Sequence, residues 1–130
     1  MEYSFGQEQL DRLERVLAAD LIVTGVSCVL LIDMAGNIIT RCDDGHCDID
    51  VYSLAALSAG NFGAVEAMAK IVGEEEFTLL FHKGEKENIH FSKIDEDFLL
   101  ITIFNNEMSL GFIRLKVTEA IKKIKGVWGK

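Results

Sequence analysis

The residues best suited to chemistry are two cysteines and a histidine, Cys42, His46 and Cys47, in a polar segment over residues 42–48. A zinc site takes four thiolate or imidazole ligands, which commonly come from paired Cys-x₂₋₄-Cys units. The spacing here is Cys-x₃-His-Cys, no second pair follows, and the adjacent His46 and Cys47 are poorly placed to bind one ion. We therefore interpret the segment as a loop with incidental thiols. A thiol or metal sensor centred on these residues is kept as the alternative.

Aspartates surround the same segment and raise the question of a calcium site. A calcium-binding EF-hand loop needs ligands at positions 1, 3, 5 and 12. The aspartates here do not follow that order, so we interpret them as solvated carboxylates in turns. They are Asp33, Asp43, Asp44, Asp48 and Asp50.

Motifs of catalysis and of phosphate binding are missing from the sequence. It contains no GxSxG, P-loop, GxGxxG or HExxH pattern. A cysteine nucleophile would need a histidine base beside it, as for Cys47 and His82, and nothing in the spacing brings such a pair together. Residues 60–63 (GNFG) fall inside an expected helix, so they do not form a phosphate loop. We expect no enzymatic activity, no cofactor and no bound metal.

The charge balance limits the possible partners. The chain has 13 basic and 21 acidic residues, a net charge of −8, and such a surface repels the phosphates of nucleic acid. No stretch of 18 apolar residues is present, so we expect no membrane insertion. An odd number of cysteines without an export signal fits a reducing compartment, so we expect a cytoplasmic protein.

Hydrophobic periodicity predicts one domain over residues 1–130, of the α/β (α+β) class. The expected order is α-β-β-α-β-β-β-α, with a five-stranded antiparallel sheet and helices on both of its faces. A turn at residues 34–37 links the first two strands, and Ser109 is a good cap for the last helix. The helices are expected over 7–21, over 50–72 and from 109, and the strands over 26–33, 37–41, 77–82, 88–93 and 98–104. The first and last helices each carry a single apolar stripe, which we expect to be buried on the sheet.

The middle helix carries the most informative pattern. Its expected core stripe consists of Leu54, Leu57, Asn61, Val65, Met68 and Val72. Roughly opposite lies a row of small residues: Ala56, Ala59, Gly60, Gly63, Ala64 and Ala67.

A solvated helix face normally carries charged residues, whereas this row is small and apolar. Each of Gly60 and Gly63 costs roughly 1 kcal/mol of helix stability relative to alanine. We infer that the row lets another protein approach closely, and that it forms a partner or dimer surface together with Phe77, Leu79 and Phe81 of the next strand. The alternative is that the first or last helix of the same chain covers the row.

The segment from the middle helix to the last helix resembles the roadblock/dynein-light-chain family, and in particular its bacterial MglB-like branch. The most specific parts are residues 54–57 (LAAL), the junction over 69–77, residues 81–86 (FHKGEK) and residues 110–111 (LG). The resemblance covers residues 21–120, and the expected element order is also that of the family.

The resemblance implies a homodimer in which the third strands pair across a two-fold axis and the middle helices form a platform. On that platform the family binds small Ras-like GTPases, here an MglA-like one. The MglB-like branch stimulates GTP hydrolysis by reshaping the GTPase without inserting an arginine finger, so Arg114 is not assigned that role. The alternative function is a dimeric adaptor that leaves nucleotide turnover unchanged.

Overall fold

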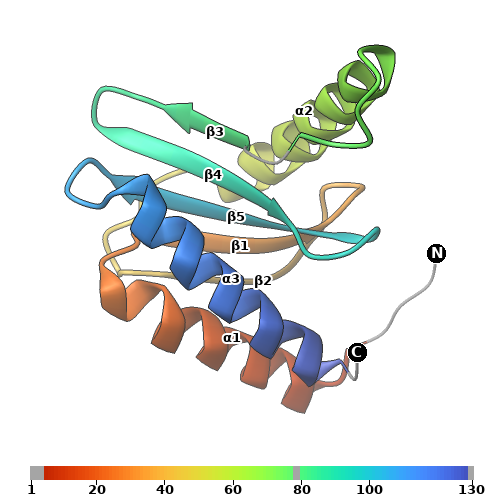
Figure 1. Cartoon of the computed structure of the whole chain (residues 1–130). Helices are drawn as coiled ribbons and strands as arrows, with labels where there is room; N and C mark the ends of the chain where they lie inside the picture. The colour runs from red at the N-terminus through yellow and green to blue at the C-terminus, as the bar shows by residue number, and fades with distance from the viewer. Residues whose placement is uncertain (1–4, 78–79, 129–130) are drawn as a thin grey trace.

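A computed structural model describes residues 5–77 and 80–128 and has the predicted order of elements (Figure 1). Three helices and five strands follow one another with a short 3₁₀ turn after the first helix. The elements are α1 (Gln7–Asp20), η1 (Ile22–Thr24), β1 (Cys28–Asp33), β2 (Ile38–Asp43), α2 (Val51–Ile71), β3 (Leu80–Lys83), β4 (Glu87–Lys93), β5 (Phe98–Asn105) and α3 (Leu110–Val127). The strands form one antiparallel sheet in the order β2-β1-β5-β4-β3, which confirms the predicted fold.

The two apolar strands β1 and β5 pair at the middle of the sheet, with Leu30 opposite Ile101. Every residue of β1 is buried, as is all of β5 except Asn105. A strand covered on both faces has no need of polar alternation, which accounts for the nearly continuous apolar runs in the sequence.

The first hairpin, between β1 and β2, is closed by the predicted turn. Gly36 has φ +93°, a left-handed conformation that favours glycine. The Asp33 carboxylate accepts hydrogen bonds from the backbone N–H groups of Ala35 (3.0 Å) and Asn37 (2.8 Å). These bonds satisfy the backbone of the turn and hold the hairpin in register.

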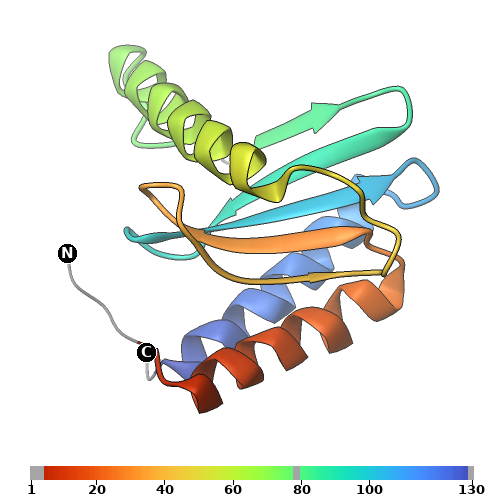
Figure 2. The same ribbon diagram turned by 180° about the vertical axis from the view of Figure 1, so that it is seen from behind.

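Helices α1 and α3 lie side by side across one face of the sheet (Figures 1 and 2). Each buries a single apolar stripe, as predicted, and Lys123 of α3 lies 2.9 Å from the Asp20 carboxylate of α1. Ser109 caps α3 by accepting a hydrogen bond from the N–H of Phe112. The buried residues of the two helices are Leu13, Leu17, Ile113, Val117, Ala120, Ile124 and Val127.

Helix α2 lies on the opposite face, where it is the only helix of the described residues, and its far end extends away from the sheet (Figure 2). The predicted core stripe of this helix is wrong at Leu57, Met68 and Val72, which are exposed, and right at Leu54, which packs against the strands' buried residues. The helix is instead seated on the sheet through Val51, Ala55, Ser58, Phe62 and Ala69. Small side chains at most of these positions bring the helix close to the strands, and the larger apolar residues point elsewhere.

Within the described residues the third strand covers Leu80–Lys83, and Phe77, predicted to lie in it, is outside any strand and 39% exposed. Leu79 lies outside the described residues.

Candidate interaction surface

The row of small residues on α2 lies at the surface of the subunit. Five of its six members are exposed, and Ala59 is half-buried. Neither α1 nor α3 covers the row, since both helices occupy the other face of the sheet (Figure 1). Covering by the first or last helix is therefore ruled out. We call the exposed apolar surface of α2 its outer face, made of Ala56, Leu57, Gly60, Gly63, Ala64, Ala67, Met68 and Ile71.

The two glycines of the outer face have no packing role among the residues that the structure describes. A Cβ atom added at Gly60 or Gly63 would meet no atom of residues 5–77 and 80–128 within 4 Å. Alanine would fit at both positions and would favour the helix by about 1 kcal/mol each. Close contact with a neighbour from outside the described subunit would explain why both positions lack a side chain.

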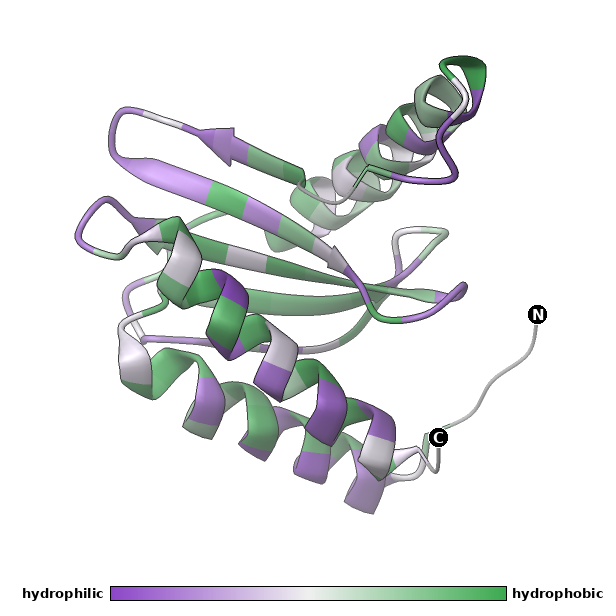
Figure 3. Ribbon diagram, viewed as in Figure 1, coloured by the Kyte–Doolittle hydropathy of each residue, from purple (hydrophilic) through white to green (hydrophobic). Residues whose placement is uncertain are grey.

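Large apolar side chains lie beside the small ones, and two of them, Leu57 and Met68, were wrongly predicted to lie in the core. Leu57 is 72% exposed, Met68 52% and Ile71 83%. Figure 3 shows apolar colouring along much of α2, including its protruding end. Contiguous exposed apolar surface of this kind on a small domain marks an interaction site or an aggregation liability.

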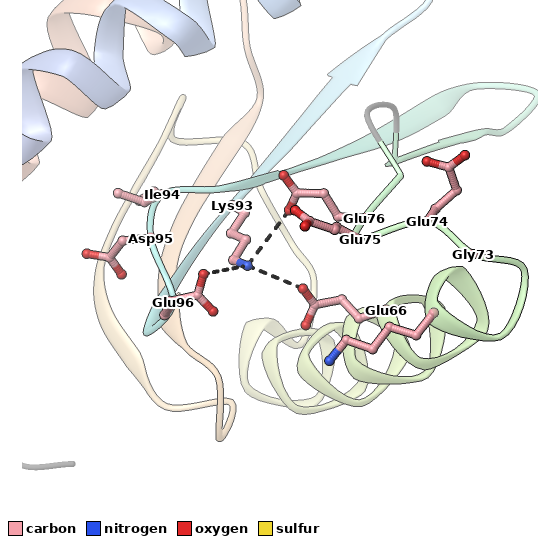
Figure 4. A pocket seen from close by; sticks show the side chains of 10 residues that line it. Glu66, Gly73, Glu74, Glu75, Glu76, Lys93, Ile94, Asp95 and Glu96 are labelled. Atoms are coloured by element: carbon pink, nitrogen blue, oxygen red, sulfur yellow. Dashed lines mark hydrogen bonds and ion pairs between the residues drawn. The ribbon is translucent and has the colours of Figure 1, made fainter.

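A charged groove bounds the side of α2 that turns toward β4 (Figure 4). At its centre the Lys93 ammonium lies 3.4 Å from Glu66, 3.7 Å from Glu76 and 3.1 Å from Glu96. Burial alone would lower the pKa of Lys93, but its hydrogen bonds to Glu96 and Glu66 raise that pKa overall. The lysine therefore stays charged and ties α2 to the end of β4.

Strand β3 forms the edge of the sheet on the side where α2 protrudes (Figures 1 and 2). Its inner edge pairs with β4, and its other edge has no strand beside it within residues 5–77 and 80–128. The Phe81 ring stacks on Phe104 with centroids 6.0 Å apart. Phe81 thus packs on the α1/α3 side of the sheet, and what β3 offers to a partner is its backbone.

The Roadblock/LC7 domain profile matches residues 9–104 of the chain. The chain belongs to the Roadblock/LC7 family. A search of curated proteins found no significant match.

Several solved structures superpose over nearly the whole chain. Myxococcus xanthus MglB is 29% identical, covers 96% of this chain and 98% of its own, and has a TM-score of 0.79. The gliding protein MglB of Thermus thermophilus is 28% identical, with 95% and 93% covered and a TM-score of 0.83. A structure described as MglB with a tetrameric arrangement is also 28% identical, with 95% and 92% covered and a TM-score of 0.86.

The cysteine-rich loop of this Roadblock/LC7 chain does not gather its three reactive residues. Cys42 packs against the cluster beneath α1 and α3, whereas Cys47 packs against the cluster beneath α2. The side chain of His46 is 89% exposed and lies 3.9 Å from Asp44. Within the described part of the chain, no three His, Cys, Asp or Glu side chains are grouped so as to hold a metal ion.

One histidine is buried in the sheet. His90 of β4 lies opposite Thr102 of β5, and its Nδ1 has no hydrogen-bond partner among the described residues. Burial lowers the pKa of His90 to about 4, and the positive charge of Arg114 acts in the same direction. His90 is therefore neutral at physiological pH and is enclosed by protein.

None of the three helices is long and apolar enough, over its described residues, to cross a bilayer.

Sequence reasoning found the small residues of the outer face but missed Leu57, Met68 and Ile71 as its members. The available signal was the alternative stripe at positions 51, 55, 58, 62 and 69, which has the same helical spacing but smaller side chains.

Proposed function

We propose that this chain is a non-catalytic homodimer that binds a small Ras-like GTPase and stimulates its GTP hydrolysis. The outer face of α2 carries the proposal, because it combines exposed large apolar residues with glycines that have no role inside the subunit. The similarity to MglB from two organisms supports a GTPase as the partner. The resemblance to the MglB-like branch also implies that the GTPase supplies the catalytic residues.

Dimerisation is supported by two features on one side of the molecule. The free edge of β3 can pair with the same strand of a second copy, which would remove an edge that otherwise invites aggregation. A two-fold axis at that edge would set the two α2 helices side by side (Figure 1). Together the helices would form one broad apolar platform, larger than either outer face alone.

The dimer is tested by light scattering at micromolar concentration. A mass of twice 14.5 kDa is expected. A stable monomer across this concentration range would contradict the proposed assembly.

GTPase stimulation is tested with a Ras-like GTPase encoded beside this chain. Single-turnover GTP hydrolysis should be faster with the chain than without it, and the complex should form with the GTP-bound protein. Binding without any change in hydrolysis would support the adaptor function instead. Absence of binding in either nucleotide state would contradict both functions.

A further inference from the structure

Two of the three cysteines meet at the start of the sheet. Cys28 is the first residue of β1 and is buried on the α2 side. It pairs with Asp43 at the end of β2, and the N–H of Asp44 donates to the carbonyl of Ser27 at 3.0 Å. The chain then turns at Gly45, and Cys47 packs against the same apolar cluster that contains Cys28. Cys47 therefore lies on the same side of the sheet as Cys28, near enough to affect the ionisation of the Cys28 thiol.

The third cysteine is kept away from this pair by the pleat of the sheet. Cys42 lies opposite Val29, one position along from the pair of Cys28 and Asp43. Successive side chains of a strand point to opposite faces, and Cys42 accordingly packs on the α1/α3 side. Cys28 can therefore reach Cys47 without competition from Cys42.

Solvent reaches the pair through Cys47. This residue lines a groove of about 530 Å³ together with His46, Ile49 and Leu54, next to the first turns of α2. Burial, followed by the proximity of Cys47, raises the pKa of Cys28 to about 12. A small oxidant therefore reacts first with the accessible Cys47, and the buried Cys28 thiol reacts second.

We propose that Cys28 and Cys47 form a reversible disulfide when the protein meets a peroxide, and that this bond ties the loop entering α2 to the start of β1. In the first step hydrogen peroxide transfers an oxygen atom to the Cys47 thiol, giving a sulfenic acid and water. In the second step Cys28 sulfur attacks Cys47 sulfur, and the Cys47 hydroxyl leaves as water with the proton of the Cys28 thiol. A dithiol reductant restores both thiols by exchange. This site is independent of the proposed GTPase function.

The contact between the two thiols compensates for the poor ionisation of Cys28. Groups held in place react as if at very high local concentration. The resulting bond would close a loop that includes all of β2 and ends three residues before Asp50, which caps α2 through the N–H of Ser53. Oxidation would then restrain the loop that leads into α2, the helix that carries the outer face. It should also raise the thermal stability of the chain.

The test uses the full chain, first reduced and then treated with hydrogen peroxide. Intact mass should fall by two hydrogen atoms, and two of the three thiols should no longer be alkylated. Trypsin cleaves after Arg41, so a disulfide should link the peptides 16–41 and 42–70. A Cys42→Ser variant should form the same link, whereas Cys28→Ala and Cys47→Ser should not.

The melting temperature gives a second readout. Oxidised wild type and oxidised Cys42→Ser should melt roughly 5 °C or more above their reduced forms, and Cys47→Ser should show no such gain. If Cys28→Ala does not fold, Cys47→Ser and the peptide link still decide the outcome. A stable sulfinic acid at Cys47, a link through Cys42, or no loss of thiols would each overturn the proposal.

Discussion

The two faces of the sheet differ in how their helices are held. On one face α1 and α3 each bury a single apolar stripe, and Leu13, Leu17, Ile113 and Ile124 are fully enclosed. On the other face α2 is apolar nearly all round, yet it buries mainly small residues and leaves Leu57 and Ile71 in solvent. The first arrangement is complete within one chain. The second has the properties of a half-interface.

This difference separates folding from association. A helix that is hydrophobic all round is normally buried on all sides, and α2 reaches that state only if a partner covers its outer face. The α1/α3 layer should then determine the stability of the subunit. The outer face should determine what the subunit binds. The following variants test this separation.

The largest expected effect comes from a matched pair of leucine truncations. Leu17→Ala should lower the free energy of unfolding by about 2–5 kcal/mol, because Leu17 is fully buried. Leu57→Ala, at an exposed site, should change it by less than about 0.5 kcal/mol in dilute solution. Urea unfolding at several protein concentrations measures both, and the Leu57→Ala cost should grow as wild type dimerises. Equal costs at all concentrations would mean that Leu57 is packed inside the subunit.

Acid should destabilise the α1/α3 side through His90. The unfolded chain takes up a proton near the ordinary histidine pKa of about 6.5, whereas folded His90 does so only at about 4. His90 therefore does not lower the free energy of unfolding above pH 6.5, and this free energy falls as the pH falls from 6.5 to 4. The loss amounts to about 3 kcal/mol.

The acid effect is measured by urea unfolding between pH 7 and pH 4. His90→Gln should flatten the pH dependence by that amount relative to wild type. His46→Gln, at an exposed histidine, serves as the control and should leave the profile unchanged. If the stability of His90→Gln depends on pH as that of wild type does, His90 takes up its proton as readily in the folded protein as in the unfolded chain.

A large cation on the outer face should block association and spare the fold. Gly63→Arg and Ala67→Arg should weaken dimer or GTPase binding at least tenfold, or about 1.4 kcal/mol, with helical content retained. Gly111→Arg is the matched control, since Gly111 is an exposed helical glycine on the other side of the sheet. Circular dichroism and binding titrations give the two readouts. Unfolding of the α2 variants, or unchanged binding, would place the interaction surface elsewhere.

The smallest expected effect comes from Gly60, and Gly84 provides a contrast. Gly60→Ala should raise the stability of the dilute subunit by about 1 kcal/mol, because no atom of the described residues lies near the added Cβ. Gly84→Ala should lower it by about 1–3 kcal/mol, because the added Cβ would clash with the carbonyl of Glu87. Thermal melts at low concentration measure both. A loss of stability in Gly60→Ala would show that this part of α2 is packed within the chain.

Much of the fold followed from local patterns in the sequence. The order of elements, the hairpin turn at Gly36, the Ser109 cap and the buried stripes of α1 and α3 were all predicted and are confirmed. In each case the signal comes from residues close in the chain and has one solution. A one-sided stripe can be buried in only one way, and a left-handed turn favours glycine.

The thiol pair could not be predicted, because its members come from different elements. Cys42 and Cys47 are close in sequence, yet the pleat of β2 sends Cys42 to the opposite face of the sheet from Cys47. Cys28 lies far from both in sequence and meets Cys47 only through the pairing of β1 with β2. Sequence distance gave no information about this contact.

The sequence by itself determined that the middle helix is apolar, contains small residues and has few charges. It follows that protein must cover more than one side of this helix. Only the tertiary structure decided which side of the helix faces the sheet. Helical periodicity defines two stripes on α2, one through Leu57 and Met68 and one through Ala55 and Phe62, and hydrophobicity does not choose between them. The helix packs on the sheet through the stripe with the smaller side chains, because these allow the helix to lie closer to the strands. The larger residues are thereby left exposed on the outer face.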